Sequence, residues 1–223
     1  MYFTALMPMK GHSERVPGKN LRNFNGKPLY HNMMETLLKS KYIKKIVIDT
    51  DSEEIIKDIQ ENFTDIQIII RDSPLRGDLV SMNKIIEYDI NNIDGEYFIQ
   101  THSTNPLLTS ATIDEAIEKL IQNMDKYDSV FSVTELKTRL YDDKGEPINH
   151  NPAILERTQD LKSIYEENSN FYIFTRQSFN KGKCRIGEKP VLYIENKLEA
   201  IDIDYEEDFI IAESIFKNIV NSK

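Results

Sequence analysis

The 223-residue sequence has one cysteine, Cys184, and no tryptophan. A single thiol excludes an intramolecular disulfide and any cysteine-rich metal site, and it is typical of proteins from a reducing compartment. No hydrophobic run approaches the roughly 20 residues that a membrane-spanning helix needs. Residues 1–9 are apolar but lack the basic region and cleavage site of an export signal, so we expect them to form a first strand. These features predict a cytoplasmic protein with no membrane partner.

Positive charge is also scarce, because 28 Lys and Arg stand against 37 Asp and Glu, for a net charge of −9. Proteins that bind nucleic acid hold its phosphates with clustered basic side chains, so the composition argues against such a partner. Hydrophobic residues make up 39% of the chain and charged residues 29%, which indicates an ordinary folded protein. The length suits one α/β domain spanning residues 1–223.

Short apolar stretches alternate with longer segments whose apolar residues recur every three or four positions. The short stretches predict strands at 2–7, 45–50, 66–70, 97–100, 129–133, 171–174 and 191–194. The longer segments predict helices at 28–39, 53–62, 80–91, 112–123 and about 206–221. Ser52 is a predicted N-cap, and Thr112 with Glu115 has the spacing of a capping box. This alternation predicts an α/β fold with a mainly parallel sheet flanked by helices.

Residues 135–170 interrupt the alternation. The segment is polar, with turn signals at 143–145 and 151–152, and only its end returns to an apolar strand pattern. So short a polar segment cannot bury a core of its own. We therefore interpret 135–170 as an arm inserted into the domain, and we expect it to pack on a second subunit.

The most informative segment, residues 8–21, directly follows the first predicted strand. In open α/β sheets, ligands bind at the carboxyl ends of the strands. The segment combines Gly11, Ser13 and Gly18 with the cations Lys10, Arg15 and Lys19. Glycines let the backbone approach an anion, exposed amides donate to phosphate oxygens, and cations neutralise charge. A solvated surface loop is the alternative interpretation, because the segment matches neither the P-loop nor the Gly-x-Gly-x-x-Gly pattern.

This loop, followed by Asn25-Gly26-Lys27-Pro28-Leu29, resembles the signature of the acylneuraminate cytidylyltransferases, also called CMP-sialic acid synthetases. Further matches follow in the family's order, at Ile48-Asp49-Thr50-Asp51-Ser52-Glu53-Glu54, at Asn105-Pro106-Leu107 and at Ile201-Asp202-Ile203-Asp204. The resemblance covers nearly the whole chain and is weakest in the arm. It implies a Rossmann-like sheet of the nucleotide-diphospho-sugar transferase type, with the arm building a homodimer.

The resemblance also implies an activity. A cytidylyl group would pass from CTP to the anomeric hydroxyl of a sialic acid-like nonulosonate, with Mg²⁺ as cofactor and pyrophosphate as leaving group. Charge on the phosphates must then be balanced by the metal, cations and backbone amides. The implied catalytic residues are Lys10, Lys19, Asp202 and Asp204. The implied nucleotide-binding residues are Lys10, Gly11, Ser13, Arg15, Lys19, Asn20, Arg71, Asp78 and Ser81.

Asp202 and Asp204 are the candidate metal ligands. Alternate residues of an extended segment point the same way, so the pair presents two carboxylates together. Mg²⁺ is usually held by one or two carboxylates plus substrate phosphates. The alternative makes Asp204 a helix N-cap and Asp202 a solvated acid. The resemblance favours metal binding.

Other candidate nucleotide contacts have structural alternatives. Arg71 is expected to bind the nucleotide, but a surface ion pair would also explain it. Asp78 is as well explained as the cap of the helix predicted from residue 80. Asp51 precedes Ser52-Glu53-Glu54, and helix initiation accounts for it.

The substrate candidates are His102, Thr104 and Asn105, which follow the fourth strand, and Arg157 in the arm. His102 stands where the family has a glutamine, and a structural hydrogen bond to the loop backbone is its alternative role. Arg157 resembles an arginine that the family inserts into the neighbouring active site, where it would bind the sugar carboxylate or a phosphate. An interfacial ion pair is the alternative.

The chain departs from the family at Lys10, which replaces an arginine, and at Glu14, which replaces a basic residue. Glu166 also falls near a basic position of the family's pattern. Three other functions therefore stay open. They are a nucleotidyltransferase for a sugar 1-phosphate or an eight-carbon keto acid, a glycosyltransferase that holds a nucleotide-sugar with Asp-x-Asp, and a non-catalytic nucleotide-binding homologue.

Overall fold

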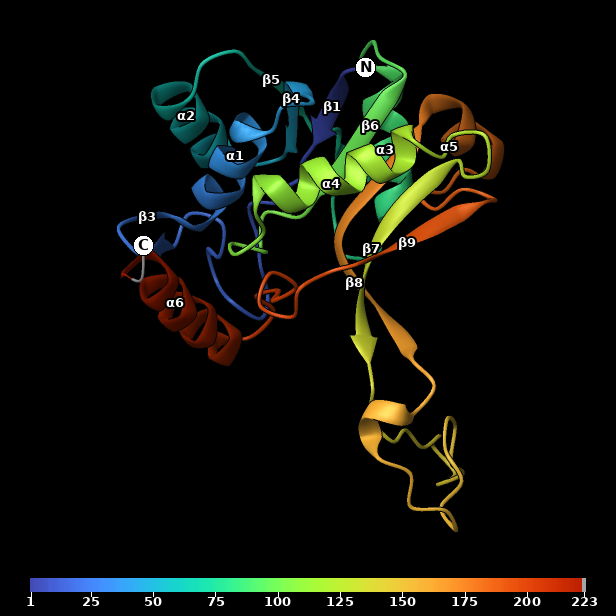
Figure 1. Cartoon of the computed structure of the whole chain (residues 1–223). Coiled ribbons are helices and arrows are strands. Elements are labelled where there is room, and N and C mark those ends of the chain that lie inside the picture. Colours follow the sequence, from blue (N-terminus) through green and yellow to red (C-terminus); the bar gives the residue numbers. More distant parts are fainter. Residues whose placement is uncertain (222–223) are drawn as a thin grey trace.

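A seven-stranded sheet runs through the centre of the computed structural model, which describes residues 1–221 (Figure 1). Four strands at one side are parallel, β8 is antiparallel to both of its neighbours, and β9 is parallel to β7. The mainly parallel α/β sheet predicted from the sequence is therefore confirmed. The strand order is β5 (Ile66–Ile70), β4 (Ile43–Thr50), β1 (Phe3–Leu6), β6 (Tyr97–Thr101), β8 (Ile164–Thr175), β7 (Ser129–Leu136) and β9 (Pro190–Ile194).

Helices cover both faces of the sheet because alternate strand residues point to opposite sides. On β4, Ile48 faces the core beneath α1 (Leu29–Lys39), α2 (Glu53–Asn62) and α4 (Ser110–Ile121). Val47 faces the other core, beneath α3 (Met82–Asn91) and α5 (Arg176–Gly182). Each helix contributes the apolar side chains of its three- and four-residue spacing. None of the helices within residues 1–221 is long and apolar enough to cross a membrane.

A third, smaller core lies beside the sheet. The short hairpin of β2 (Asn23–Phe24) and β3 (Lys27–Pro28) packs against α6 (Glu206–Asn221), with Phe24 and Phe209 in edge-to-face contact at 5.5 Å between ring centroids. Ile203 is fully buried in the same cluster. This packing holds the segment before α6 against the N-terminal third of the chain.

Several predicted boundaries are wrong. α3 begins at Met82, after the N-cap Ser81, so Asp78 does not cap it. α4 begins at Ser110, because the Thr109 side chain accepts from the amide of Thr112 at 3.3 Å, and the predicted capping box at Thr112 does not form. Ser52 does cap α2, as predicted. The sequence patterns missed α5, β2 and β3, which are too short to establish a period.

The arm is rooted in a β-ribbon. β7 and β8 extend beyond the sheet and pair as far as Leu136 with Ile164, so both strands are longer than predicted. Residues 137–163 form an irregular lobe at the end of this ribbon, projecting away from the body of the molecule (Figure 1). The strands were underestimated because a ribbon exposed on both faces carries polar residues, such as Glu166 and Glu167, in place of apolar alternation.

Candidate active site

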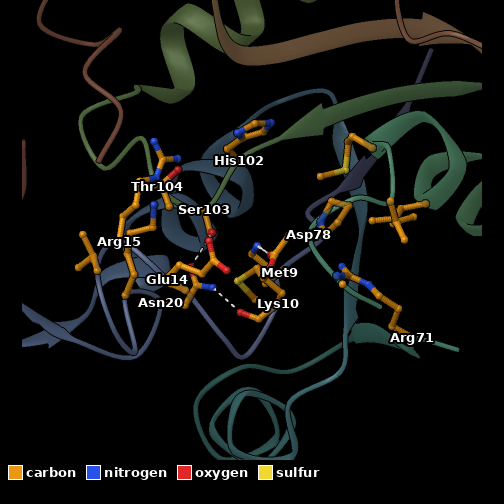
Figure 2. Close-up of a pocket in the computed structure, with 18 residues that line it drawn as sticks. Met9, Lys10, Glu14, Arg15, Asn20, Arg71, Asp78, His102, Ser103 and Thr104 are labelled. Carbon is orange, nitrogen blue, oxygen red and sulfur yellow. Dashed lines mark hydrogen bonds and ion pairs between the residues drawn. The ribbon is translucent and has the colours of Figure 1, made fainter. Parts of the chain in front are cut away.

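A cleft of about 560 Å³ opens at the carboxyl edge of the parallel strands, where ligands bind in sheets of this kind. It lies between the loop after β1, the β5–α3 connection and the exit of β6. Figure 2 shows Arg15 and Thr104 on one side of the cleft and Arg71 on the other. Four cations line it against two acids, Glu14 and Asp78, so the cleft is positive in a chain whose net charge is −9. The lining cations are Lys10, Arg15, Lys19 and Arg71.

The loop after β1 is held against the start of α2. The amide of Gly11 donates to Asp51 Oδ1 at 2.8 Å, so Asp51 anchors the loop as well as preceding the helix. A Cβ at Gly11 would lie 2.8 Å from the Cβ of Ser52, which explains the glycine by close approach. In residues 1–221, the amides of 12–16 donate to no other group. Those amides are therefore free to bind an anion.

Asn20 ties the loop to β6. Its Nδ2 donates to the carbonyl of Lys10 at 3.1 Å, and its Oδ1 accepts from Ser103 Oγ at 2.7 Å. The side chain is buried. Asn20 thus positions the backbone of Lys10 in the cleft (Figure 2). A direct contact of Asn20 with nucleotide stays a prediction.

The two aspartates of the last motif reach the loop from the other end of the chain. Asp204 Oδ1 lies 2.7 Å from Arg15 Nη2 and 3.7 Å from Lys19 Nζ, and Lys19 also donates to the Ile203 carbonyl. Thr104 Oγ1 donates to Asp202 Oδ1, and the Ile203 amide donates to the Thr104 carbonyl at 3.0 Å. The pair therefore lies at the edge of the cleft, beside three residues that line it.

The alternative interpretation of Asp204 as the N-cap of the last helix is wrong. α6 begins at Glu206, and the Asp204 carboxylate pairs with Arg15. Asp208, in the first turn of α6, accepts through its Oδ2 from the amides of Asp204 and Tyr205 at 3.0 and 2.8 Å. Asp202 is not a solvated acid, since burial raises its pKa, opposed by the hydrogen bond from Thr104. Both carboxylates are thus left for chemistry at the cleft.

Arg71 lines the cleft from a buried ion pair. Its Nε donates to Asp49 Oδ1, and its Nη2 donates to the Asp49 carbonyl at 3.1 Å. Asp89 of α3 lies against this pair, and burial together with the Asp49 charge raises the pKa of Asp89. The alternative of an ion pair is thus correct for Arg71, but the pair is interior and not at the surface. Its contact with nucleotide stays a prediction.

Asp78 pairs with Lys10 across the mouth of the cleft, and this contact lowers the pKa of Asp78. Both side chains are partly exposed. Ser81 is exposed and lies outside the set of residues that line the cleft. The structure therefore places Asp78 with the loop and Ser81 at its periphery.

The residues after β6 divide into two groups. Thr104 and Asn105 contact the aspartate segment, Asn105 through a bond from Nδ2 to the Ile201 carbonyl at 3.4 Å. His102 lines the cleft, as Thr104 does, but its buried Nε2 has no hydrogen-bond partner within the described part of the chain. Burial, with the charges of Arg185 and Lys19, lowers the pKa of His102 to about 4. His102 is therefore a neutral imidazole with an unused nitrogen.

Arg157 does not join these residues within one chain. It lies in the arm, where its Nε is 2.6 Å from Asp160 Oδ2 and its side chain is exposed. Figure 1 shows the arm pointing away from the body that carries the cleft. The predicted contact of Arg157 with substrate therefore depends on a second subunit.

A family model described as Cytidylyltransferase matches residues 4–221. The chain belongs to this family. It is accordingly a nucleotidyltransferase, as the resemblance implied.

The relatives of this cytidylyltransferase include full-length matches. The pseudaminic acid cytidylyltransferase of Campylobacter jejuni serotype O:2 is 26% identical, over 96% of this chain and 95% of that protein. The N-acylneuraminate cytidylyltransferase A of Danio rerio is 28% identical over 95% of this chain and 50% of its own length. The resemblance to acylneuraminate cytidylyltransferases is thereby confirmed.

Solved structures share the fold. CMP:2-keto-3-deoxy-manno-octonic acid synthetase, in complex with CTP, superposes with a TM-score of 0.68 at 11% identity, covering 98% of this chain and 99% of that one. The 4-diphosphocytidyl-2C-methyl-D-erythritol synthase of Anaerococcus prevotii superposes with a TM-score of 0.67 at 16% identity, covering 97% and 96%. This cytidylyltransferase therefore shares its Rossmann-like fold with these two structures.

Proposed function

We propose that the enzyme transfers CMP from CTP to the anomeric hydroxyl of a sialic acid-like nonulosonate and releases pyrophosphate, with Mg²⁺. The carrying observation is the meeting of the cationic loop with Asp202 and Asp204 at one cleft. The substrate class is supported by relatives that match this chain along nearly its whole length and are named for pseudaminic and N-acylneuraminic acids.

The chain's own groups have defined tasks in this proposal. The triphosphate lies along residues 10–19, where the free amides of 12–16 donate to its oxygens. Lys10 and Lys19 neutralise the charge that develops on the attacked phosphate and on the leaving pyrophosphate. Removing one such preorganised donor typically costs about 10²–10³ in rate. Asn20 and Asp51 keep the loop in place without contacting the reacting atoms.

The residues at the cleft fit a magnesium ion. Hard carboxylate oxygens suit Mg²⁺, which usually takes one or two of them together with substrate phosphates. Residues 1–221 contain no cluster of three or more His, Cys, Asp or Glu that would hold a metal by itself, so phosphate oxygens must complete the set. Asp202 and Asp204 would hold the ion. When bound, it would supply Lewis-acid stabilisation of the phosphates.

The arm supports a homodimer. Its lobe exposes the apolar side chains of Tyr141, Ile148, Ile154 and Leu155, the last to 91%. We propose that they pack on a second copy of the chain, and that Arg157 then reaches the neighbour's cleft. Lys10 is paired with Asp78 and Arg15 with Asp204, so the triphosphate must displace these acids to reach the two cations. The neighbour's Arg157 would supply a further cation. The predicted cytoplasmic location stays a prediction.

A coupled assay tests the proposal. Purified protein is mixed with CTP, Mg²⁺ and N-acetylneuraminate, pseudaminate or an eight-carbon keto acid, and pyrophosphate release is measured. Release with a nine-carbon acid is expected. Parallel reactions replace CTP by UTP, GTP or TTP, or the acid by a sugar 1-phosphate. Release only with the eight-carbon acid or the sugar phosphate would replace the proposed substrate.

The same protein separates the remaining alternatives. Calorimetry that shows CTP binding without turnover by any acid would indicate the non-catalytic homologue. Binding of an intact nucleotide-sugar with no pyrophosphate chemistry would indicate the glycosyltransferase. Asp204→Asn is the matched negative control in every reaction.

A further inference from the structure

Arg185 lies just outside the cleft, in the connection between α5 and β9. Its Nη1 donates to Gln100 Oε1, and its guanidinium carbon lies 3.9 Å from the ring centroid of Tyr172. Gln100 and Tyr172 are direct cross-strand partners on β6 and β8. Arg185 therefore contacts this strand pair close to the end of β6, and its partner Gln100 lies two residues before His102 in the chain.

The connection holds Arg185 in place. The Arg185 amide donates to Asn83 Oδ1 at 3.2 Å, one residue after the cleft-lining Met82, and the Gly187 amide donates to Ser129 Oγ at 2.8 Å. A Cβ at Gly187 would overlap Asp128, so the glycine lets the chain approach that carboxylate. Hydrogen bonds from its amide to Asn83 and from its side chain to Gln100 thus tie Arg185 to the two segments that carry the cleft-lining residues Met82 and His102.

Within residues 1–221, no carboxylate pairs with the Arg185 guanidinium. Burial lowers the pKa of Arg185. The negative charge of Glu167 acts to raise the pKa of Arg185, but the Glu167 carboxylate accepts a hydrogen bond from the Tyr172 hydroxyl. A guanidinium has five N–H donors, and the only hydrogen bond that the Arg185 guanidinium makes in the described chain is to Gln100. A partly buried guanidinium with unused N–H donors can take an anion as its further partner.

His102 has an unused nitrogen, and Arg185 bonds to Gln100, which lies two residues before His102 in the chain. The positive charge of Arg185 also contributes to lowering the pKa of His102. The buried Nε2 of His102 has no hydrogen-bond partner in the described chain. A ligand that carries a carboxylate beside a hydroxyl would satisfy both groups. A planar carboxylate matches the fork geometry of a guanidinium.

We propose that Arg185 binds the carboxylate of the sugar-acid substrate and so sets the preference for an acid. This inference rests on the proposed function, because it names the residue that recognises that substrate. The other candidate cation, Arg157, is paired with Asp160, and the arm carries Glu166 near a position that is basic in the family's pattern. Arg185 supplies the recognition from within the same subunit.

The test compares Arg185→Gln with the wild type, using the acid that the wild type turns over. Loss of a charge-assisted hydrogen bond predicts a rise of about 10- to 100-fold in KM for the acid, with KM for CTP changed less than about twofold. The KM of Arg185→Lys for the acid should lie between that of the wild type and that of Arg185→Gln. Lys183→Gln is the matched control, since it removes an exposed charge two residues away that pairs with Glu87 at 2.7 Å, and it should behave as the wild type.

A chemical comparison distinguishes recognition from a structural role. The wild type should prefer the free acid over its methyl ester, and Arg185→Gln should lose most of that preference. Equal KM values for acid and ester in the wild type overturn the proposal, whether or not the variant folds. So does an Arg185→Gln variant with an unchanged KM for the acid.

Binding without catalysis separates this inference from the proposed function. N-acetylneuraminate or pseudaminate is titrated calorimetrically into protein that holds CTP and EDTA. If the acid binds to the wild type, Arg185→Gln weakens that binding and no turnover is found, the role of Arg185 is supported and the proposed reaction is rejected. Turnover by a wild type whose acid binding does not depend on Arg185 keeps the reaction and rejects this inference.

Discussion

Arg15 and Asp204 form an ion pair, with Arg15 Nη2 2.7 Å from Asp204 Oδ1, although they are 189 residues apart in the chain. The Arg15 guanidinium also lies 5.1 Å from the ring centroid of Tyr205. Both charged side chains are about half exposed, so the pair is a weak source of stability. Its significance is positional, because it joins the first loop to the carboxylates that precede the last helix.

Asp202→Asn and Asp204→Asn should each lower turnover by about 10²–10³, because each removes a charge from the site proposed for the metal and phosphates. Asparagine keeps the shape of the side chain, so circular dichroism and melting temperature should stay close to those of the wild type. Glu207→Gln, which neutralises an exposed acid in the first turn of α6, is the control and should keep full activity. Wild-type rates in both aspartate variants would remove the metal assignment.

Arg71→Met should reduce the free energy of unfolding by about 3–5 kcal/mol, because it leaves the buried Asp49 carboxylate unpaired. Urea denaturation followed by circular dichroism measures the loss. A second change, Asp49→Asn, should recover part of it by removing the orphaned charge. Arg76→Met is the control, since that side chain is exposed and, within residues 1–221, donates only to the Arg71 carbonyl. Equal stability of the two arginine variants would contradict the buried pair.

Glu195→Gln should flatten the pH dependence of stability. Glu195 accepts from Asn168 and Asn170 beneath the segment that leads to Asp202, and burial raises its pKa from 4.5 to about 8. The folded state thus holds the proton more tightly than the unfolded state. The stability that the folded state gains from this proton is complete below about pH 4.5 and is lost as the pH rises towards 8.

Glutamine carries no such proton, so the melting temperature of the wild type should fall relative to that of Glu195→Gln between pH 5 and 8. The unpaired Oδ1 of Asn170 lets that amide turn over and accept from the new glutamine. Thermal melts at constant ionic strength give the comparison, with Glu188→Gln as an exposed control. If the melting temperature changes with pH in the same way for the wild type and for Glu195→Gln, a raised pKa of Glu195 in the folded state is rejected.

Leu155→Asp combined with Ile154→Asp should convert the proposed dimer to a monomer, because both side chains are exposed on the arm and a charge there cannot be buried cheaply. Light scattering after gel filtration gives the mass. Leu38→Asp, at an exposed apolar position of α1, should not change it. A wild-type protein that is already a monomer at assay concentration would refute the arm's proposed role.

Arg157→Ala mixed with Asp204→Asn should regain activity if Arg157 serves the neighbour's cleft. Each variant alone is expected to be weak, but a mixed dimer has one cleft with both residues intact. Random exchange of subunits predicts recovery of about a quarter of the wild-type rate. Activity is measured after the two proteins are unfolded together and refolded. No gain over the separate variants would place Arg157 outside the partner's site.

Sequence patterns correctly predict those elements that are decided by residues close together in the chain. The periodicity of α2 and the cap at Ser52 were predicted correctly, because a helix start is decided by residues three apart. The start of α4 was predicted wrongly, because two threonines compete there and hydrogen bonds from Thr109 to the Glu199 carboxylate favour Thr109 as the cap. The sequence did not predict a role for Arg185, because no residue near it in the chain indicates that it contacts Gln100 and Tyr172 in the fold.

The sequence by itself determined the alternation of strands and helices, the cationic loop after the first strand and the two alternating aspartates. These follow from side-chain period, turn chemistry and motif order, which are properties of neighbouring residues. Only the tertiary structure decided that Asp51 holds Gly11, that Arg71 is buried on Asp49, and that Arg185 forms no ion pair with a carboxylate of the described chain. Strand order and burial create these relationships, and both depend on contacts between residues that are distant in the chain.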